Sequence, residues 1–268
     1  MFQLLNKEFR NIVTPKFIIV WFLLILAPVI YTLSTVKQYS LLDRLDLYEL
    51  HLSTILPLLF PLIVVLIYLA NFSGETKNNF LSYTRLRIDI KQYLRTKLIA
   101  NNIIVFIIMF SFVFIPFLFA FYIEPSLGII NFEPENSGLN AAQLLNNSYN
   151  RFTFSQLLEY GTFTYGFLYS AWVGLNGIVY ATLGFFALLL INNRFLALSI
   201  PFLLYHLGSF IIAVVNVPMV LLDASIFPFN ISQYPIWTAF IQLLFLCCII
   251  FSLYIYTNKN LYRLDNVK

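Results

Sequence analysis

The sequence predicts an all-α integral membrane protein with six transmembrane helices. Of its 268 residues, 60% are apolar and only 10% are charged, whereas soluble domains have roughly 45–50% apolar and about 25% charged residues. Several apolar runs reach the ~20 residues that a helix needs to cross a ~30 Å hydrocarbon core. The basic residues gather on alternate connections between these runs. These observations exclude a water-soluble enzyme, a disordered chain and a nucleic-acid-binding protein.

Six apolar runs account for the predicted spans. They cover residues 17–36, 53–72, 103–123, 167–191, 195–215 and 236–256. None of them contains Asp, Glu, Lys or Arg, which are costly at membrane depth. Each run therefore predicts one transmembrane helix.

The charges between the runs predict the orientation. One side of the membrane receives 13 of the 16 Lys and Arg residues and the other side receives 3. Cytoplasmic connections carry an excess of Lys and Arg. We therefore expect both termini in the cytoplasm, with the cytoplasmic segments at 1–16, 73–98, 192–194 and 257–268 and the outer segments at 37–52, 124–160 and 216–235.

Residues 1–16 predict an amphipathic helix. On a helical wheel, one stripe of about 100° gathers the apolar side chains of Phe2, Leu5, Phe9, Ile12 and Val13. We expect this helix to lie flat in the cytoplasmic interface and to end at Pro15. The alternative is a frayed polar tail.

Residues 73–98 form a basic connection with regular apolar positions. Asp89 followed by Gln92 predicts an N-cap with a capping box, which opens a helix that continues into the third span. A shorter helix over about residues 78–86 would lie on the cytoplasmic surface. The alternative is a solvated basic loop whose only role is to set the orientation of the chain in the membrane.

The outer segments differ from one another. Residues 124–160 form a long loop in which 140–149 could be a short surface helix. Residues 216–235 are apolar but are broken by Pro218, Pro228 and Pro235. Such a stretch favours a re-entrant hairpin in the outer leaflet, which requires protein to cover its backbone.

Motifs for catalysis and nucleotide binding are missing from the sequence. It contains no phosphate-binding loop, no zinc-protease motif and no nucleophile elbow. We therefore expect no enzyme activity, metal or cofactor in this chain. The polar candidates inside the spans are Asn176, His206 and Gln242, which could line a translocation path or could simply join helices by hydrogen bonds.

The fourth run has small residues at helical spacing. Gly166, Ser170 and Gly174 recur every four residues, and Gly177 and Gly184 follow. Small residues let helix backbones approach closely in a membrane. A packing seam is predicted here, either within one subunit or between two.

This layout resembles the permease subunits of type-2 ABC exporters. The opening NKEFRNIVTPKFIIVWFLLILAPVI is similar to the elbow helix and first span of that family. SGETKNNFLSYTRLRIDIKQYLRTKLIA is similar to its coupling loop, with Glu75 and Lys77 at its start and the run 97–100 at its end. Two departures are Arg87, where the family commonly has Pro, and the long outer loop 124–160.

The resemblance implies a single permease domain over residues 1–268, located in a cell membrane, with a bacterial plasma membrane favoured. A second permease subunit, forming a homodimer, and two copies of a cytoplasmic ABC ATPase would complete the exporter. ATP and Mg²⁺ would bind to the ATPase. The coupling helix, about residues 78–87, would enter a cleft of the ATPase through the residues Phe80, Leu81, Tyr83, Arg85, Arg87 and Asp89.

The resemblance also implies a class of substrate. We expect export of an amphiphilic peptide or drug-like molecule, for antimicrobial peptide secretion or self-protection. The alternatives are export of a lipid-linked glycan or polysaccharide, and a membrane sensor or scaffold that transports nothing. Nucleic acid is not expected as a partner.

Overall fold

The computed structural model describes residues 2–53, 55–77 and 88–261, and every regular element among these residues is helical. Six of the helices are long and apolar enough to cross a membrane. These are α2 (Pro15–Thr35), α4 (Leu56–Lys77), α6 (Ile90–Leu118), α9 (Thr162–Leu190), α10 (Arg194–Val214) and α11 (Trp237–Asn260). They match the six apolar runs in number and order, which confirms that prediction.

Helix α6 is longer than its apolar run. It begins at Ile90, and its 29 residues measure about 44 Å at 1.5 Å per residue, more than the ~30 Å hydrocarbon core. Asp89 is its N-cap, as predicted, and Oδ1 of Asp89 accepts a hydrogen bond from the Lys91 N–H at 3.2 Å. The predicted capping box with Gln92 is wrong, because the cap engages the second helical residue instead of the third.

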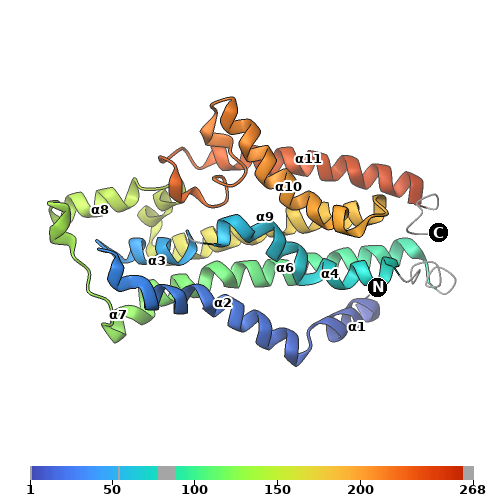
Figure 1. Cartoon of the computed structure of the whole chain (residues 1–268), viewed down its shortest axis with the longest axis horizontal. Coiled ribbons are helices and arrows are strands. Elements are labelled where there is room, and N and C mark those ends of the chain that lie inside the picture. The colour runs from blue at the N-terminus through green and yellow to red at the C-terminus, as the bar shows by residue number, and fades with distance from the viewer. Residues whose placement is uncertain (1, 54, 78–87, 262–268) are drawn as a thin grey trace.

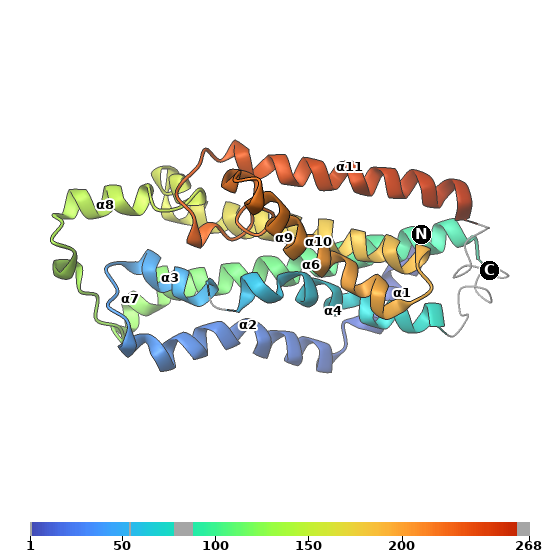
Figure 2. The ribbon, with the colours of Figure 1, turned by 45° about the horizontal axis from the view of Figure 1, so that its top comes forward.

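Helix α9 is the centre of the bundle. Of its most hydrophobic stretch, 83% of residues are buried, against 22% in α10 and α11 and 17% in α2. Figures 1 and 2 show α9 running along the middle of the molecule, with α6 beside it. The central helix therefore contacts protein on nearly all sides, and the peripheral helices leave large apolar surfaces for lipid.

The small residues of α9 bring it close to α6 and α4. A Cβ atom added at Gly166 would lie 2.3 Å from the ring of Phe117 on α6, and one at Gly184 would lie 2.7 Å from Leu69 on α4. A side chain at either position would require the neighbour to move. The predicted packing seam thus exists, and it lies within one subunit.

The two ends of the bundle carry different elements. In Figures 1 and 2, α1 (Phe2–Ile12) lies at the end of the bundle that also holds the C-terminal ends of α4 and α11 and the N-terminal end of α6. At the opposite end lie α7 (Glu124–Leu127) and α8 (Ala141–Tyr149). An even number of crossings brings the two ends of the described chain to one side, as the charge pattern predicts.

Part of the predicted outer segment 37–52 is a structured element of the core. Helix α3 (Arg44–Leu52) begins with a capping box between Asp43 and Asp46. Its Tyr48 is fully buried and its ring packs edge-on against those of Phe117, Tyr165 and Tyr169. On the long outer loop, α8 agrees with the short helix predicted at 140–149, and Asn140 caps it.

Residues 216–235 contain only two short 3-10 turns, Pro218–Val220 and Pro228–Asn230. The middle of the segment is buried against α9. There the Tyr169 hydroxyl donates to the Ile226 carbonyl at 3.0 Å, and Nε1 of Trp172 donates to the Ser225 carbonyl at 2.9 Å. Side chains of α9 thus bond two backbone carbonyls of this irregular segment.

Candidate functional site

Helix α1 packs against the bundle through the stripe predicted from the sequence. Leu5, Phe9 and Ile12 are half-buried and contact the core, whereas Phe2 is 82% exposed. Thr14 caps the next helix by accepting from the Phe17 N–H at 3.3 Å, and Pro15 opens it. The chain therefore turns sharply between α1 and α2.

A buried cluster of charges joins α1 to the ends of α4 and α6. Lys97 of α6 is 5% exposed, and its ammonium lies 2.8 Å from Oε1 of Glu8 and 2.5 Å from Oε1 of Glu75. The Tyr68 hydroxyl donates to Glu8 at 2.8 Å, and the Tyr93 hydroxyl donates to Glu75 at 2.8 Å. We call these five residues the Lys97 cluster.

The Lys97 cluster combines attraction with unbalanced charge. Two carboxylates share one ammonium, so the cluster has one negative charge in excess when all three groups are ionised. Tyr68 and Tyr93 offset this excess by donating hydrogen bonds, and the ammonium also lies 5.3 Å from the centre of the Tyr93 ring. Removing one partner from such a buried cluster leaves an uncompensated charge, which destabilises the fold.

A polar cavity adjoins the cluster. It has a volume of about 300 Å³ and is partly open, and Asn11 and Asn71 line it together with Glu8, Tyr68, Glu75 and Lys97. Helices α1, α4 and α6 thus meet around one polar space. Glu75 and Lys97 belong to the helices immediately before and after residues 78–87, so the cluster ties together the two helices flanking that segment and also holds α1.

The predicted ATPase-contacting residues Phe80, Leu81, Tyr83, Arg85 and Arg87 lie outside the described residues. Asp89 is described, and its carboxylate caps α6. The resemblance did single out Glu75 and Lys97, and the structure brings their side chains into direct contact.

The polar span residues do not form one group. Nε2 of Gln242 on α11 donates to Oδ1 of Asn176 on α9 at 2.6 Å, and both side chains are buried. His206 on α10 lies apart from this pair, with its Nε2 3.0 Å from the Leu58 carbonyl of α4. Both contacts are hydrogen bonds between helices, which was the alternative to a role in a translocation path.

Sequence reasoning missed Glu8, Tyr68 and Tyr93. Glu8 had a detectable signal, because it falls at helical spacing between Leu5 and Ile12 on the stripe that packs against the bundle. The two tyrosines had none, since aromatic residues are common throughout the spans. Their role depends on contacts over 60 and 18 positions of sequence, respectively.

A second charged cluster, also missed, joins elements of the opposite end. Arg151 forms ion pairs with Asp43, at 3.4 Å, and with Asp46, and the Ser148 hydroxyl donates to Asp43. These contacts attach the long outer loop to the start of α3. Burial raises the pKa of nearby Glu49 to about 7, opposed by the cation of Arg151 and reinforced by the charges of Asp46 and Asp43.

Across 2–53, 55–77 and 88–261, no group of three or more His, Cys, Asp or Glu side chains is placed to hold a metal ion. Comparison with protein-family models, with curated proteins and with solved structures finds no match for this chain.

Proposed function

We propose that this chain is the permease subunit of a type-2 ABC exporter. The observation that carries the proposal is the Lys97 cluster, in which Glu75 and Lys97 connect the two helices flanking residues 78–87 and Glu8 attaches α1 to them. A force applied to residues 78–87 would reach α4, α6 and α1 together. An exporter that is driven by a separate ATPase needs such a mechanical connection.

In this proposal α1 is the elbow helix. It lies along the cytoplasmic membrane surface, with Leu5, Phe9 and Ile12 against the bundle and the exposed Phe2 in the lipid interface. Residues 216–235 form the re-entrant hairpin of the outer leaflet, supported by the hydrogen bonds that Tyr169 and Trp172 donate to its backbone. The excess of basic residues on the side of α1 supports cytoplasmic termini.

The motor lies in another polypeptide. Two copies of a cytoplasmic ABC ATPase bind ATP and Mg²⁺, and each receives residues 78–87 of one permease subunit in a homodimer. Closure of the ATPases pushes on this segment, and the Lys97 cluster passes the movement to α1, α4 and α6. The bundle then shifts between inward-open and outward-open states. The substrate is an amphiphilic peptide or drug-like molecule.

The test is a double charge reversal, Arg85→Glu with Arg87→Glu, in the permease purified together with its ATPase. We expect substrate-stimulated ATP hydrolysis to fall at least tenfold while membrane insertion is unchanged, because the two cations would pair with carboxylates of the ATPase. Arg44→Glu, an exposed change on α3, is the matched control and should have no effect on hydrolysis.

Three results would contradict the proposal. The first is unchanged coupling in the Arg85/Arg87 variant. The second is accessibility labelling that places Arg95 on the outside of the cell. The third is transport by the purified chain without any ATPase. Stimulation by lipid-linked glycans in place of peptides would keep the exporter and change its substrate, and an ATPase that binds without any stimulated transport would favour a sensor or scaffold.

A further inference from the structure

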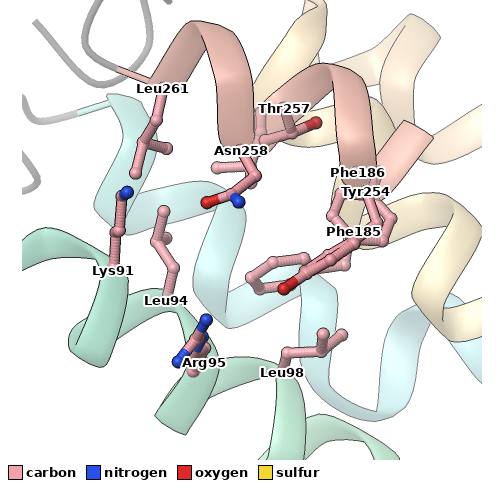
Figure 3. Close-up of a pocket in the computed structure, with 11 residues that line it drawn as sticks. Lys91, Leu94, Arg95, Leu98, Phe185, Phe186, Tyr254, Thr257, Asn258 and Leu261 are labelled. Atoms are coloured by element: carbon pink, nitrogen blue, oxygen red, sulfur yellow. The ribbon is translucent and has the colours of Figure 1, made fainter. Parts of the chain in front are cut away.

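A second cavity lies at the same end of the bundle as the Lys97 cluster and shares no lining residue with the first. It is a small pocket of about 50 Å³ between α6, α9 and α11, and it opens to the surface. Its apolar lining comes from α6 and α9, from one residue of α11 and from the residue that follows α11: Leu94, Leu98, Phe185, Phe186, Leu189, Tyr254 and Leu261. Figure 3 shows these helices enclosing the space between them.

One side of this cavity carries positive charge. Lys91 and Arg95 lie one turn apart on α6, and Figure 3 shows their charged groups on the side of α6 that faces α11. Among the residues that the structure describes, no carboxylate forms an ion pair with either of them. Asn258 adds an amide to the same opening.

A buried hydroxyl without a partner also lines the cavity. Thr257 on α11 is 5% exposed, and its Oγ1 has no hydrogen-bond partner among the described residues. Buried polar atoms are nearly always satisfied in folded proteins, so an unsatisfied one next to a cavity indicates a missing partner. Apolar walls, two unpaired cations and this hydroxyl are together the features that a bound amphiphilic anion would satisfy.

We propose that this cavity binds one anionic phospholipid of the cytoplasmic leaflet. Its phosphate lies between Lys91 and Arg95, and one acyl chain lies against Leu98 and Tyr254, the apolar lining side chains that the protein leaves partly exposed. Basic pockets between transmembrane helices on the cytoplasmic side bind anionic headgroups in this way. The positive-inside charge pattern puts the cavity at that leaflet. The site does not require the proposed ATPase partner.

Charge and shape favour this occupant over others. A free anion would pair with Lys91 and Arg95 but would leave Leu98 and Tyr254 uncovered. An apolar peptide segment would cover these two side chains but would leave both cations unpaired. A zwitterionic lipid carries a compensating positive charge next to its phosphate, which weakens its attraction to the two cations.

The experiment measures lipid retention by native mass spectrometry on the full chain, released from nanodiscs of equal phosphatidylglycerol and phosphatidylcholine. We expect one phosphatidylglycerol to be retained in preference to phosphatidylcholine. The double variant Lys91→Gln with Arg95→Gln should retain it about 25-fold less, on the order of fivefold for each cation. Lys259→Gln removes an exposed cation from the same end of α11 outside the cavity, and it should behave as the wild type.

Several outcomes would overturn the proposal. These are equal retention of the two lipids, wild-type retention in the double variant, and displacement of phosphatidylglycerol by millimolar inorganic phosphate, which would indicate a site for a free anion. Deletion of residues 262–268 that increases retention tenfold would identify that segment as the occupant. Should the double variant fail to fold, Arg95→Gln alone, at an exposed position, carries the same test with a fivefold loss expected.

Discussion

Replacing Lys97 with Met tests the physical basis of the Lys97 cluster. The ammonium is removed while the carboxylates of Glu8 and Glu75, whose side chains are 12% and 29% exposed, remain without a counter-charge. Breaking a buried ion pair from one side costs about 3–5 kcal/mol. Because Glu75 keeps some contact with water, we expect the lower end of that range, about 3 kcal/mol.

The assay is thermal unfolding of the purified chain in detergent, with a midpoint lowered by about 5–10 °C in the Lys97→Met variant. Lys259→Met, an exposed change, should stay within about 0.5 kcal/mol of the wild type. Adding Glu8→Gln and Glu75→Gln to Lys97→Met should restore most of the loss, since the unpaired charges then disappear. The reasoning is refuted if Lys97→Met behaves like the Lys259 control or if the triple variant regains nothing.

Two further predictions concern the outer end and the centre of the bundle. With a pKa raised to about 7, Glu49 lowers the stability of the fold progressively as the pH rises from about 4.5 to 7. Above pH 7, Glu49→Gln should therefore be more stable than the wild type by about 1–2 kcal/mol, after allowance for partial exposure, and should unfold at a higher temperature. Below pH 4 its stability should equal that of the wild type. An equal gain at both pH values would contradict this. Gly166→Ala forces a Cβ atom to 2.3 Å from the buried Phe117 ring, so the free energy of unfolding should fall by about 1–3 kcal/mol. Gly74→Ala, with open space around it, is the neutral control. Equal effects of the two substitutions would contradict the close approach of Gly166 to Phe117.

The spans could be predicted because their signal is local. Each apolar run reaches the length of a membrane crossing within about 20 consecutive residues, and the resulting helices agree with the runs in number and order. The limits of α6 could not be predicted from hydropathy, because its first turns are polar and basic. The Asp89 cap was a better guide to where that helix begins.

The contacts between distant residues could not be predicted from a single sequence. Glu8 and Lys97 are 89 positions apart, and Asp46 and Arg151 are 105 positions apart. Nothing local distinguishes these charges from others in the same segments. Helix α3 was also missed, since its apolar and acidic residues alternate irregularly and its partners Phe117 and Tyr165 come from two distant spans.

The distribution of burial suggests which helices could move. Helices α4, α6 and α9 pack closely along the glycine seam, and the Lys97 cluster ties α4 and α6 to each other and to α1 at one end. Helices α10 and α11 are buried over only 22% of their most hydrophobic stretches. Two described side-chain hydrogen bonds join α10 to α4, from His206 to the Leu58 carbonyl and from Arg194 to the Ser73 carbonyl, and one joins α11 to α9, from Gln242 to Asn176. Breaking one such bond costs on the order of 1 kcal/mol, against about 3 kcal/mol for the Lys97 cluster. Measured by these polar contacts, separating α11 from α9 costs less than separating α1, α4 and α6 at the Lys97 cluster.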